Sequence, residues 1–350
     1  MLRSIKLFGP SAVTLVLAAG MQPAQAVVTA SGMDDSAYMM AAPPDLSNAF
    51  DAVAKITFAL PGGGQGLCTG SLLAGGQYVL TSAQCVQGGS LSLAFKQGTE
   101  VRVASQVFVN PHWNASNAAH VEQSLSNGSD LALIRLDQAV SSVQGFTMAN
   151  GSQVGKNVLI AGFGKLGSGE TGAMFDADGL HYGYNSLDLT LQTFQTPISG
   201  AITPVHGEVY VADFDDGTQE HNSVARIGEH FGQTWASSAG LGAGEALIAG
   251  GDAGSGAYVF EQGRWQLAGV NSFMQGPCHN LGVGCDPIPW GQSSYGDIMG
   301  SVAVYSQRQW IDSVMMPVPE PQSYALFIAG LMGLSFALRQ ARVSVSHSRR

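Results

Sequence analysis

Basic residues are scarce in this sequence, with 15 Lys and Arg against 25 Asp and Glu in 350 residues. Six of the 15 basic residues lie in the two end segments, which contain no acidic residue: Arg3, Lys6, Arg339, Arg342, Arg349 and Arg350. Residues 27–338 therefore carry nine basic and 25 acidic side chains, a net charge of −16. Such an acidic body repels phosphate backbones, which excludes a nucleic-acid partner.

Long stretches with a helical period are also missing, and none of useful length precedes Ser306–Val314. Glycine is abundant at 46 residues, and short runs rich in Val, Leu and Phe alternate with glycine turns. The runs are Lys55–Leu60, Leu67–Leu73, Tyr78–Thr81, Leu91–Phe95, Val101–Val109, Leu131–Leu136 and Val158–Ala161. Many short strands at regular spacing favour an all-β sandwich or barrel.

Only the two ends of the chain carry apolar runs of the kind that act as targeting signals. At the start, Arg3 and Lys6 precede an apolar run over 12–19, and Ala24-Gln25-Ala26 is an A-x-A cleavage site. This order is typical of a secretory signal over residues 1–26. Cleavage leaves Val27 as the new N-terminus.

The C-terminal segment 316–350 has three parts in a fixed order. Val318-Pro319-Glu320-Pro321 is followed by a largely apolar run over 324–338 and then by arginines. This order resembles the PEP-CTERM sorting tail of Gram-negative bacteria. The resemblance implies export across the inner membrane to the periplasm, cell surface or exterior, transient membrane contact through 324–338, and processing by an exosortase. A plain membrane anchor is the alternative, although the run is short for a bilayer span.

Cysteines are few but even in number. Four of them suit an oxidising compartment, and they allow three pairings. Cys68–Cys85 and Cys278–Cys285 are favoured because each pair brackets a short loop.

One glycine-rich loop, Gly250-Gly251-Asp252-Ala253-Gly254-Ser255-Gly256, organises the functional interpretation. Glycines at this density let consecutive N–H groups converge on one point, which suits a negative charge. The loop resembles the Gly-Asp-Ser-Gly-Gly loop of the trypsin/chymotrypsin family, in which the nucleophilic serine follows the Gly-Asp pair. Here that position holds Ala253, whose methyl group cannot attack a carbonyl.

Further stretches resemble this family, in the family's order, over about residues 55–314. They are Cys68–Leu73 with Tyr78–Cys85, then Ser129–Leu136, Gly269–Phe273 and Val304–Ile311. The resemblance implies two antiparallel six-stranded β-barrels that meet near residue 150, with a short C-terminal helix. We expect a signal over 1–26, an N-terminal segment over 27–53, a trypsin-like domain over 54–315 and the tail after it.

The resemblance also implies roles for individual residues. Asp130 occupies the position of the triad carboxylate, and Gln84 stands where the family has its catalytic histidine. The N–H groups of Gly251 and Ala253 correspond to the oxyanion hole, and Ser272 and Phe273 to the wall of the substrate cleft. Asp252 is the expected partner of the freed Val27 ammonium, and Leu247 stands at the specificity position, which predicts an apolar pocket.

The substitutions remove both reactive groups. A glutamine amide has no lone pair that titrates near neutral pH, so Gln84 cannot take a proton. Losing the nucleophile or the base of such a triad costs roughly a millionfold in turnover. Ser255 is expected to point away from the cleft, and His112 and His120 to lie in surface loops.

We therefore expect an inactive protease homologue that binds peptide or protein segments. The alternatives are an active serine endopeptidase that uses other residues, and a passive surface or matrix component. No cofactor and no metal site is expected. Segments 176–179 and 213–217 resemble calcium loops without the full ligand spacing, and ordinary Asp-Gly turns explain them better.

Overall fold

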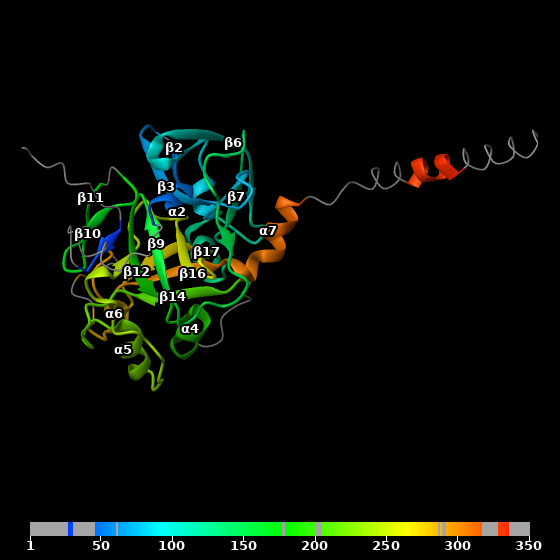
Figure 1. Ribbon diagram of the computed structural model, residues 1–350. Helices are drawn as coiled ribbons and strands as arrows, with labels where there is room; N and C mark the ends of the chain where they lie inside the picture. The colour runs from blue at the N-terminus through cyan, green and yellow to red at the C-terminus, as the bar shows by residue number, and fades with distance from the viewer. Residues whose placement is uncertain are drawn as a thin grey trace, which may run out of the picture.

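The computed structural model describes residues 27–30, 46–60, 62–176, 179–199, 205–285, 288, 292–316 and 328–335. The expected signal over 1–26, much of the segment 27–53 and most of the tail lie outside these residues. Figure 1 shows a two-part β body, with α7 at one side of it.

The first half of the body is a closed barrel of six strands in the order β2-β3-β4-β7-β6-β5. The strands are β2 (Val53–Ala59), β3 (Gln65–Leu72), β4 (Tyr78–Thr81), β5 (Leu91–Phe95), β6 (Glu100–Val109) and β7 (Ala132–Leu136). All pairs are antiparallel. Each strand falls within two residues of a predicted run, since apolar runs at strand length mark strands that are buried on the inner face.

The second half is a curved sheet that stays open. Its main path runs β12-β9-β16-β17-β18-β14-β13, and the short strand β8 pairs with β17. The bounds are β8 (Thr147–Met148), β9 (Asn157–Gly162), β12 (His181–Ser186), β13 (Leu189–Thr190), β14 (Val209–Asp213), β16 (Gly256–Glu261), β17 (Arg264–Gln275) and β18 (Ile298–Ala303). The expected second closed barrel of six strands is thus a half-barrel.

A side chain bridges the gap that the open sheet leaves between β12 and β14. The Asn185 amide donates to the carbonyl of Asp213 at 2.9 Å and to that of Ala246 at 2.8 Å. An asparagine side chain therefore makes the contact that a strand ladder would make in a closed barrel.

A small sheet holds the N-terminal residues of the described chain. Its order is β11-β10-β1-β15, with β1 (Val28–Thr29), β10 (Leu166–Ser168), β11 (Gly172–Phe175) and β15 (Ala246–Leu247). Val28 pairs with Leu247 in antiparallel register. The sheet thereby places Val27 and Val28 beside the chain that leads into the glycine-rich loop.

Helices are short, but several precede residue 306, contrary to the expectation. They are α2 (Leu46–Ala49), α3 (Ala118–Ser126), α4 (Leu191–Ser199), α5 (Ser223–His230), α6 (Pro277–Leu281) and α7 (Arg308–Met315), with short 3-10 turns such as η2 (Ala83–Val86). Asn117 and Asn222 cap α3 and α5 with their side chains. Caps stabilise helices too short to show a clear apolar period.

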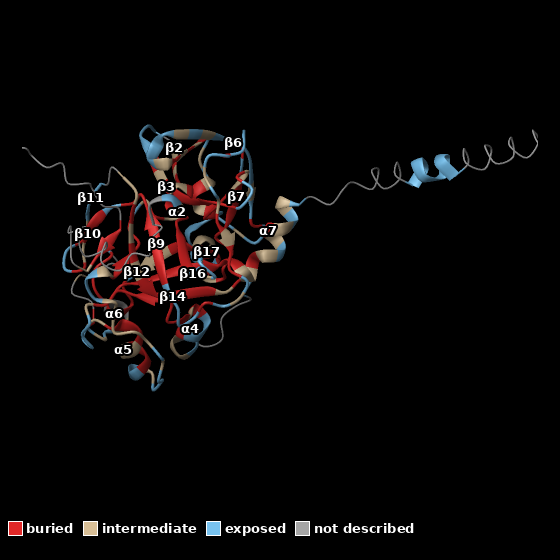
Figure 2. Ribbon diagram, viewed as in Figure 1, coloured by how far each residue is buried: buried red, intermediate tan, exposed pale blue. Residues whose placement is uncertain are grey.

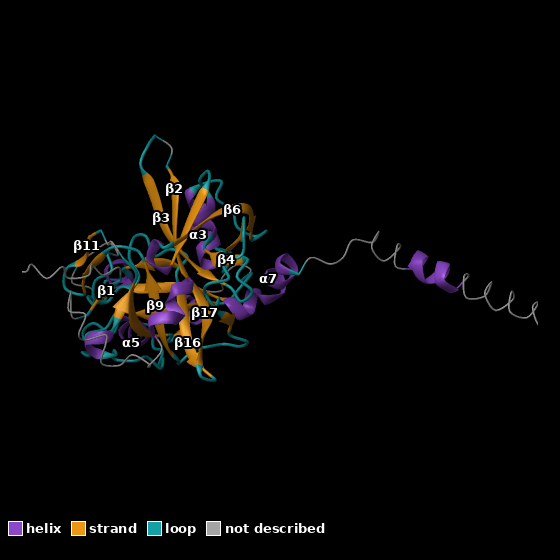
Figure 3. Cartoon of the chain, turned by 45° about the horizontal axis from the view of Figure 1, so that its top comes forward, coloured by secondary structure: helices purple, strands orange, loops and turns teal. Residues whose placement is uncertain are grey.

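No helix among the described residues is long and apolar enough to cross a membrane. The described part of the apolar tail is a short exposed helix over 328–335. Figure 2 shows the buried residues gathered inside the two halves and along the junction between them. The three-dimensional arrangement of the two halves and of β1 is also visible in Figure 3.

Candidate functional site

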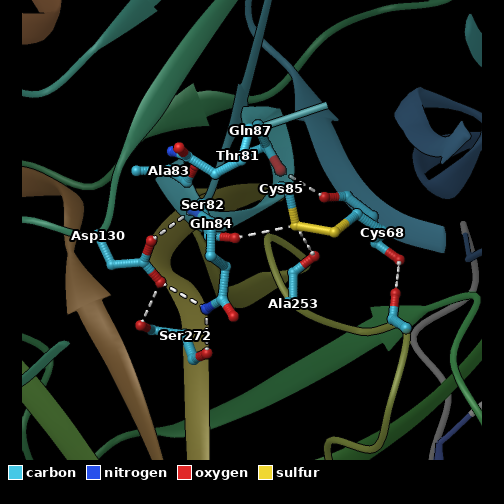
Figure 4. Close-up of a disulfide and its surroundings, with 12 residues drawn as sticks. Cys68, Thr81, Ser82, Ala83, Gln84, Cys85, Gln87, Asp130, Ala253 and Ser272 are labelled. Carbon is cyan, nitrogen blue, oxygen red and sulfur yellow. Dashed lines mark hydrogen bonds between the residues drawn. A yellow bond between two sulfur atoms is a disulfide. The ribbon is translucent and has the colours of Figure 1, made fainter. Parts of the chain in front are cut away.

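The site lies where η2 of the first half meets β17 of the second (Figure 4). Asp130 lies two residues before β7 begins and is fully buried. Its Oδ1 accepts the Gln84 backbone N–H at 3.0 Å, and its Oδ2 accepts the Gln84 Nε2–H at 2.7 Å and the Ser272 hydroxyl at 2.5 Å. The structure therefore brings together three of the residues that the sequence singled out.

The Gln84 amide uses both of its hydrogens in this network. Besides Asp130, Nε2 donates to the Ser272 carbonyl at 2.7 Å. Both neighbours are acceptors, so the amide nitrogen must face them and the amide oxygen must point the other way. Gln84 thus orients the carboxylate as a histidine would, without a site that can take a proton.

Burial raises the pKa of Asp130, and the hydrogen bonds from Ser272 and Gln84 lower it in part. No cation contributes to this balance among the described neighbours. Only neutral donors bind the carboxylate. They stabilise its negative charge but do not transfer a proton to or from it.

The glycine-rich loop turns sharply through two left-handed glycines, Gly251 at φ 103° and Gly254 at φ 83°. The N–H groups of Asp252, Gly254 and Ser255 donate to the carbonyls of Ala249, Asn271 and Asp252. The N–H groups of Gly251 and Ala253 have no acceptor among the described residues. These are the two donors predicted for the oxyanion hole, and the Ala253 methyl stands where a nucleophile would be.

Thr69 in β3, which sequence reasoning missed, joins the first half to this loop. Its N–H donates to the Ala253 carbonyl at 3.0 Å, and its hydroxyl donates to the Gly251 carbonyl at 3.1 Å. The hydroxyl also accepts the Phe163 N–H at 3.1 Å. A threonine in a strand does not indicate a contact with a distant loop. The one available signal was its position directly after Cys68 in a stretch that resembles the family.

Asp252 is fully buried and pairs with no basic side chain of the described residues. Its Oδ1 accepts the Gly164 N–H at 2.7 Å and its Oδ2 the Ala249 N–H at 2.9 Å. Burial raises its pKa to about 8, although these two bonds lower it. In the β1–β15 pairing Val28 lies opposite Leu247, and the buried Val27 directly precedes Val28.

Leu247 is fully buried in β15 within the core of the second half. Next to it, the buried Ser293 hydroxyl lies 2.7 Å from the Ile248 carbonyl oxygen and 2.8 Å from Met274 Sδ. The apolar specificity pocket expected at Leu247 stays a prediction.

The other candidate residues lie away from the network. The Phe273 ring packs against Gly300 of β18. Ser255 is buried, and its hydroxyl accepts the Asn271 amide at 2.8 Å. His112 is exposed and stacks on His206 with 3.7 Å between ring centres, whereas His120 lies in α3 and not in a loop.

Both predicted disulfides are present. Cys68 bonds to Cys85 across 17 residues, and Cys278 bonds to Cys285 across seven. Cys85 directly follows Gln84, and its Sγ lies 3.3 Å from the Ala253 carbonyl oxygen. The first disulfide therefore packs between the two substituted positions.

Among the described residues, no three His, Cys, Asp or Glu side chains are grouped so that they could hold a metal ion. The arrangement can bind a negative oxygen at Gly251 and Ala253 and a polar group at Gln84. Neither Gln84 nor Ala253 has a side chain that can act as a base or a nucleophile.

Comparisons with known proteins agree with this geometry. Residues 47–187 match the family model Trypsin. A search of curated proteins found no match. Among solved structures, the chain is similar to neuropsin, a serine protease expressed in the limbic system of mouse brain, with 17% identity, a TM-score of 0.50, and coverage of 76% of this chain and 95% of that one.

A structure described as HL collagenase is similar at 18% identity and a TM-score of 0.48, covering 76% of this chain and 94% of that one. The likeness to neuropsin, at 17% identity, supports the fold alone. Together with the family match, the closed barrel and the half-barrel, it shows that this chain contains a domain of the trypsin-like serine protease fold.

Proposed function

We propose that this chain is an exported, catalytically inactive trypsin-like protease homologue that binds peptide or protein segments at the junction of its two halves. One observation carries the proposal: Gln84 fills the base position with both amide hydrogens committed to Asp130 and Ser272. A residue fixed in this way preserves the site without its chemistry. Ala253 removes the nucleophile at the same time.

An open strand edge supports peptide binding. The pairing of β16 with β17 ends at Val270, and residues 273–275 of β17 pair with β18 on one side only. Their other edge lies next to the network of Gln84 and Ser272. Extended peptides bind to such edges by main-chain hydrogen bonds, and the N–H groups of Gly251 and Ala253 would donate to a peptide carbonyl oxygen at the end of that strand.

Export is supported by the leader-like residues 1–26, the two disulfides and the tail pattern. Disulfides persist in oxidising compartments outside the cytosol. The tail over 316–350 adds the expectation of transient membrane contact and processing. Detection of the mature chain outside the cytoplasm, beginning at Val27, would test this part.

A double revertant tests the catalytic part. We would express the full chain with its leader, alone and as Gln84→His with Ala253→Ser, and expose both to a fluorophosphonate probe and to casein. The revertant is expected to be labelled and to cleave casein, while the native chain does neither. Labelling of the native chain would overturn the proposal in favour of an active endopeptidase with another nucleophile.

A tryptophan substitution tests the binding part. Fluorescein-labelled unfolded casein is titrated with the native chain, and Ala253→Trp is expected to weaken the binding at least tenfold. Ala74→Trp is the matched control, because Ala74 lines a separate cavity of about 550 Å³ beside α7. Equal binding by all three proteins, or no saturable binding at all, would favour a passive surface component.

A further inference from the structure

Four carboxyl side chains are buried together beneath the segment 214–246, away from Gln84 and Ala253. Asp213 and Asp215 are each 1% exposed, Glu245 is 2% exposed and Asp188 is 8% exposed. Asp188 lies between β12 and β13, Asp213 ends β14, and Glu245 directly precedes β15. The sequence interpretation of 213–217 as an ordinary Asp-Gly turn gave no sign that Asp213 and Asp215 are buried.

Asp213 and Asp188 tie the segment to the body, and Glu245 ties its end to its start. Asp213 Oδ2 accepts the Val224 N–H at 2.8 Å at the start of α5, and Asp188 Oδ1 accepts the Ser238 N–H at 3.0 Å. Glu245 Oε1 accepts the Asp215 N–H at 3.0 Å. The bonds hold the segment at its beginning, middle and end.

Three further carboxyl oxygens are buried with no donor among the described residues: Asp188 Oδ2, Asp213 Oδ1 and Asp215 Oδ1. The charge of Asp213 also acts on Asp188, so the two carboxyl groups lie close together. Burying several unpaired carboxylates would cost far more than the fold can supply.

No neighbouring cation compensates these acids among the described residues. The charges that act on Asp215 are those of Asp213, Glu245, Asp188 and Asp216. His221 binds Asp216 at 2.7 Å, and Arg226 donates to the backbone carbonyls of Glu220 and Val283. The other titratable groups on the adjoining elements are His181, Tyr182, Tyr184, Tyr210, Glu220, Glu229, His230, Tyr295 and Asp297.

We propose that Asp188, Asp213, Asp215 and Glu245 form a proton-held latch, which anchors the segment 214–246 while it is protonated and releases it when it ionises. These side chains do not form a group that could hold a metal ion, which favours protons over a bound cation. The inference is independent of what the site at Gln84 binds. It gives the acidic body a device that senses the acidity of its surroundings.

The number of protons bound in the folded and unfolded states decides how the stability of the latch changes with pH. Burial first, and then the charge of Asp213, raise the pKa of Asp188 to about 9 and that of Asp215 to about 10. Burial raises the pKa of Glu245 to about 7. Unfolded carboxyls lose their protons near pH 4, so between about pH 4 and these values the folded chain holds more protons. The stabilisation is complete below about pH 4 and is lost as the pH rises through about 7 to 10.

Opening would spread to β15, because Glu245 directly precedes it and Ala246 and Leu247 pair with β1. A released latch therefore loosens the chain that leads into the glycine-rich loop. The first barrel shares no strand with this part of the fold and should not respond.

Hydrogen exchange of the full chain tests the latch, at about pH 5.5 and about pH 9 with labelling times scaled for intrinsic rates. Protection of 214–246 is expected to fall about tenfold more than that of β2–β7 over this range. Asp188→Asn with Asp215→Asn should remove most of the difference. Glu229→Gln is the matched control, because Glu229 is an exposed acidic side chain of α5 in the same segment and is not among the charges that act on Asp215, and it should respond like the native chain.

Two outcomes would overturn the latch. One is equal pH dependence of the segment and the first barrel in the native chain. The other is recovery of protection at the higher pH on addition of millimolar Ca²⁺, which would make the cluster a cation site. Both are measured on the native chain, so a double variant that fails to fold leaves the test intact.

Discussion

At the scale of single residues, Gln84 stabilises a buried carboxylate. Gln84→Ala removes the 2.7 Å bond from Nε2 to Asp130, and we expect it to lower the free energy of unfolding by about 1–3 kcal/mol. Urea denaturation measures the change. Gln87→Ala is the control, because the Gln87 amide donates only to the Ala83 carbonyl from an exposed position. Equal effects of the two substitutions would show that Gln84 does not support Asp130.

Gly254 is irreplaceable for two reasons. Its φ of 83° strains any side chain, and a Cβ would lie 2.4 Å from the Thr69 carbonyl oxygen. We expect Gly254→Ala to destabilise the fold by well over about 1 kcal/mol. Gly250→Ala, in the same loop with its nearest neighbour 3.9 Å away, should change stability by less than about 0.5 kcal/mol. Comparable urea midpoints for the two variants would contradict the loop geometry.

At the scale of elements, the strand β1 governs the charge on Asp252. In the uncleaved chain, burial raises the pKa of this group to about 8, so its stabilising protonated form is lost as the pH rises through that value. A Val27 ammonium freed by cleavage would favour the carboxylate and lower its pKa. We expect the uncleaved chain, made by blocking the site after Ala26, to lose more stability between about pH 7 and about pH 9 than the mature chain.

Asp252→Asn supplies the control for this comparison. Without the titrating group, the cleaved and uncleaved forms should show parallel pH profiles of the unfolding free energy. Hydrogen exchange of 248–256 should also be faster in the uncleaved native chain. If the cleaved and uncleaved native chains lose unfolding free energy identically with pH, the Val27 ammonium does not interact with Asp252.

The two disulfides should contribute differently to the free energy of unfolding, because they close loops of different length. Chain-entropy estimates give about 3 kcal/mol for the 17-residue separation of Cys68–Cys85 and about 2 kcal/mol for the seven-residue separation of Cys278–Cys285. Replacing each pair by alanine and measuring unfolding free energies checks the order. The reverse order would indicate that packing at the loop 278–285, and not loop closure, dominates.

At the scale of the whole molecule, Thr69 couples the two halves of the body. Thr69→Val keeps the shape and the N–H donor but removes the hydroxyl that contacts Gly251 and Phe163. We expect a shallower or two-step urea transition for this variant and a single steep one for the native chain. A single steep transition in both would place the coupling elsewhere in the interface.

Much of the fold could be predicted from the sequence, because apolar runs of strand length mark buried strands wherever they occur. The runs at 78–81 and 91–95 match β4 and β5 residue for residue. The half-barrel could not be predicted, since its gap is closed by one side chain, Asn185, from a remote position. Short capped helices such as α5 also escape a search for helical periods.

The part of the candidate site that could be predicted is the part built from stretches that resemble the family in sequence and in order. Gln84, Asp130 and Ser272 meet, and each belongs to a stretch (78–85, 129–136 or 269–273) that resembles the family in the family's order. The burial of Leu247 could not be predicted, because the strand direction of β15, which no local pattern records, sets where its side chain points. The buried Asp213 and Asp215 escaped for the same reason: an Asp-Gly pattern looks alike on the surface and in the interior.

The bond from Gln84 to the Ser272 carbonyl has a further consequence for how ligands would be retained. An incoming peptide N–H must share an acceptor that Gln84 already occupies, so each encounter is weakened at its centre. Release from a single copy would then be fast. Firm capture would come from avidity, when several copies on one surface engage the same long polymer and dissociation of any one is followed by rebinding.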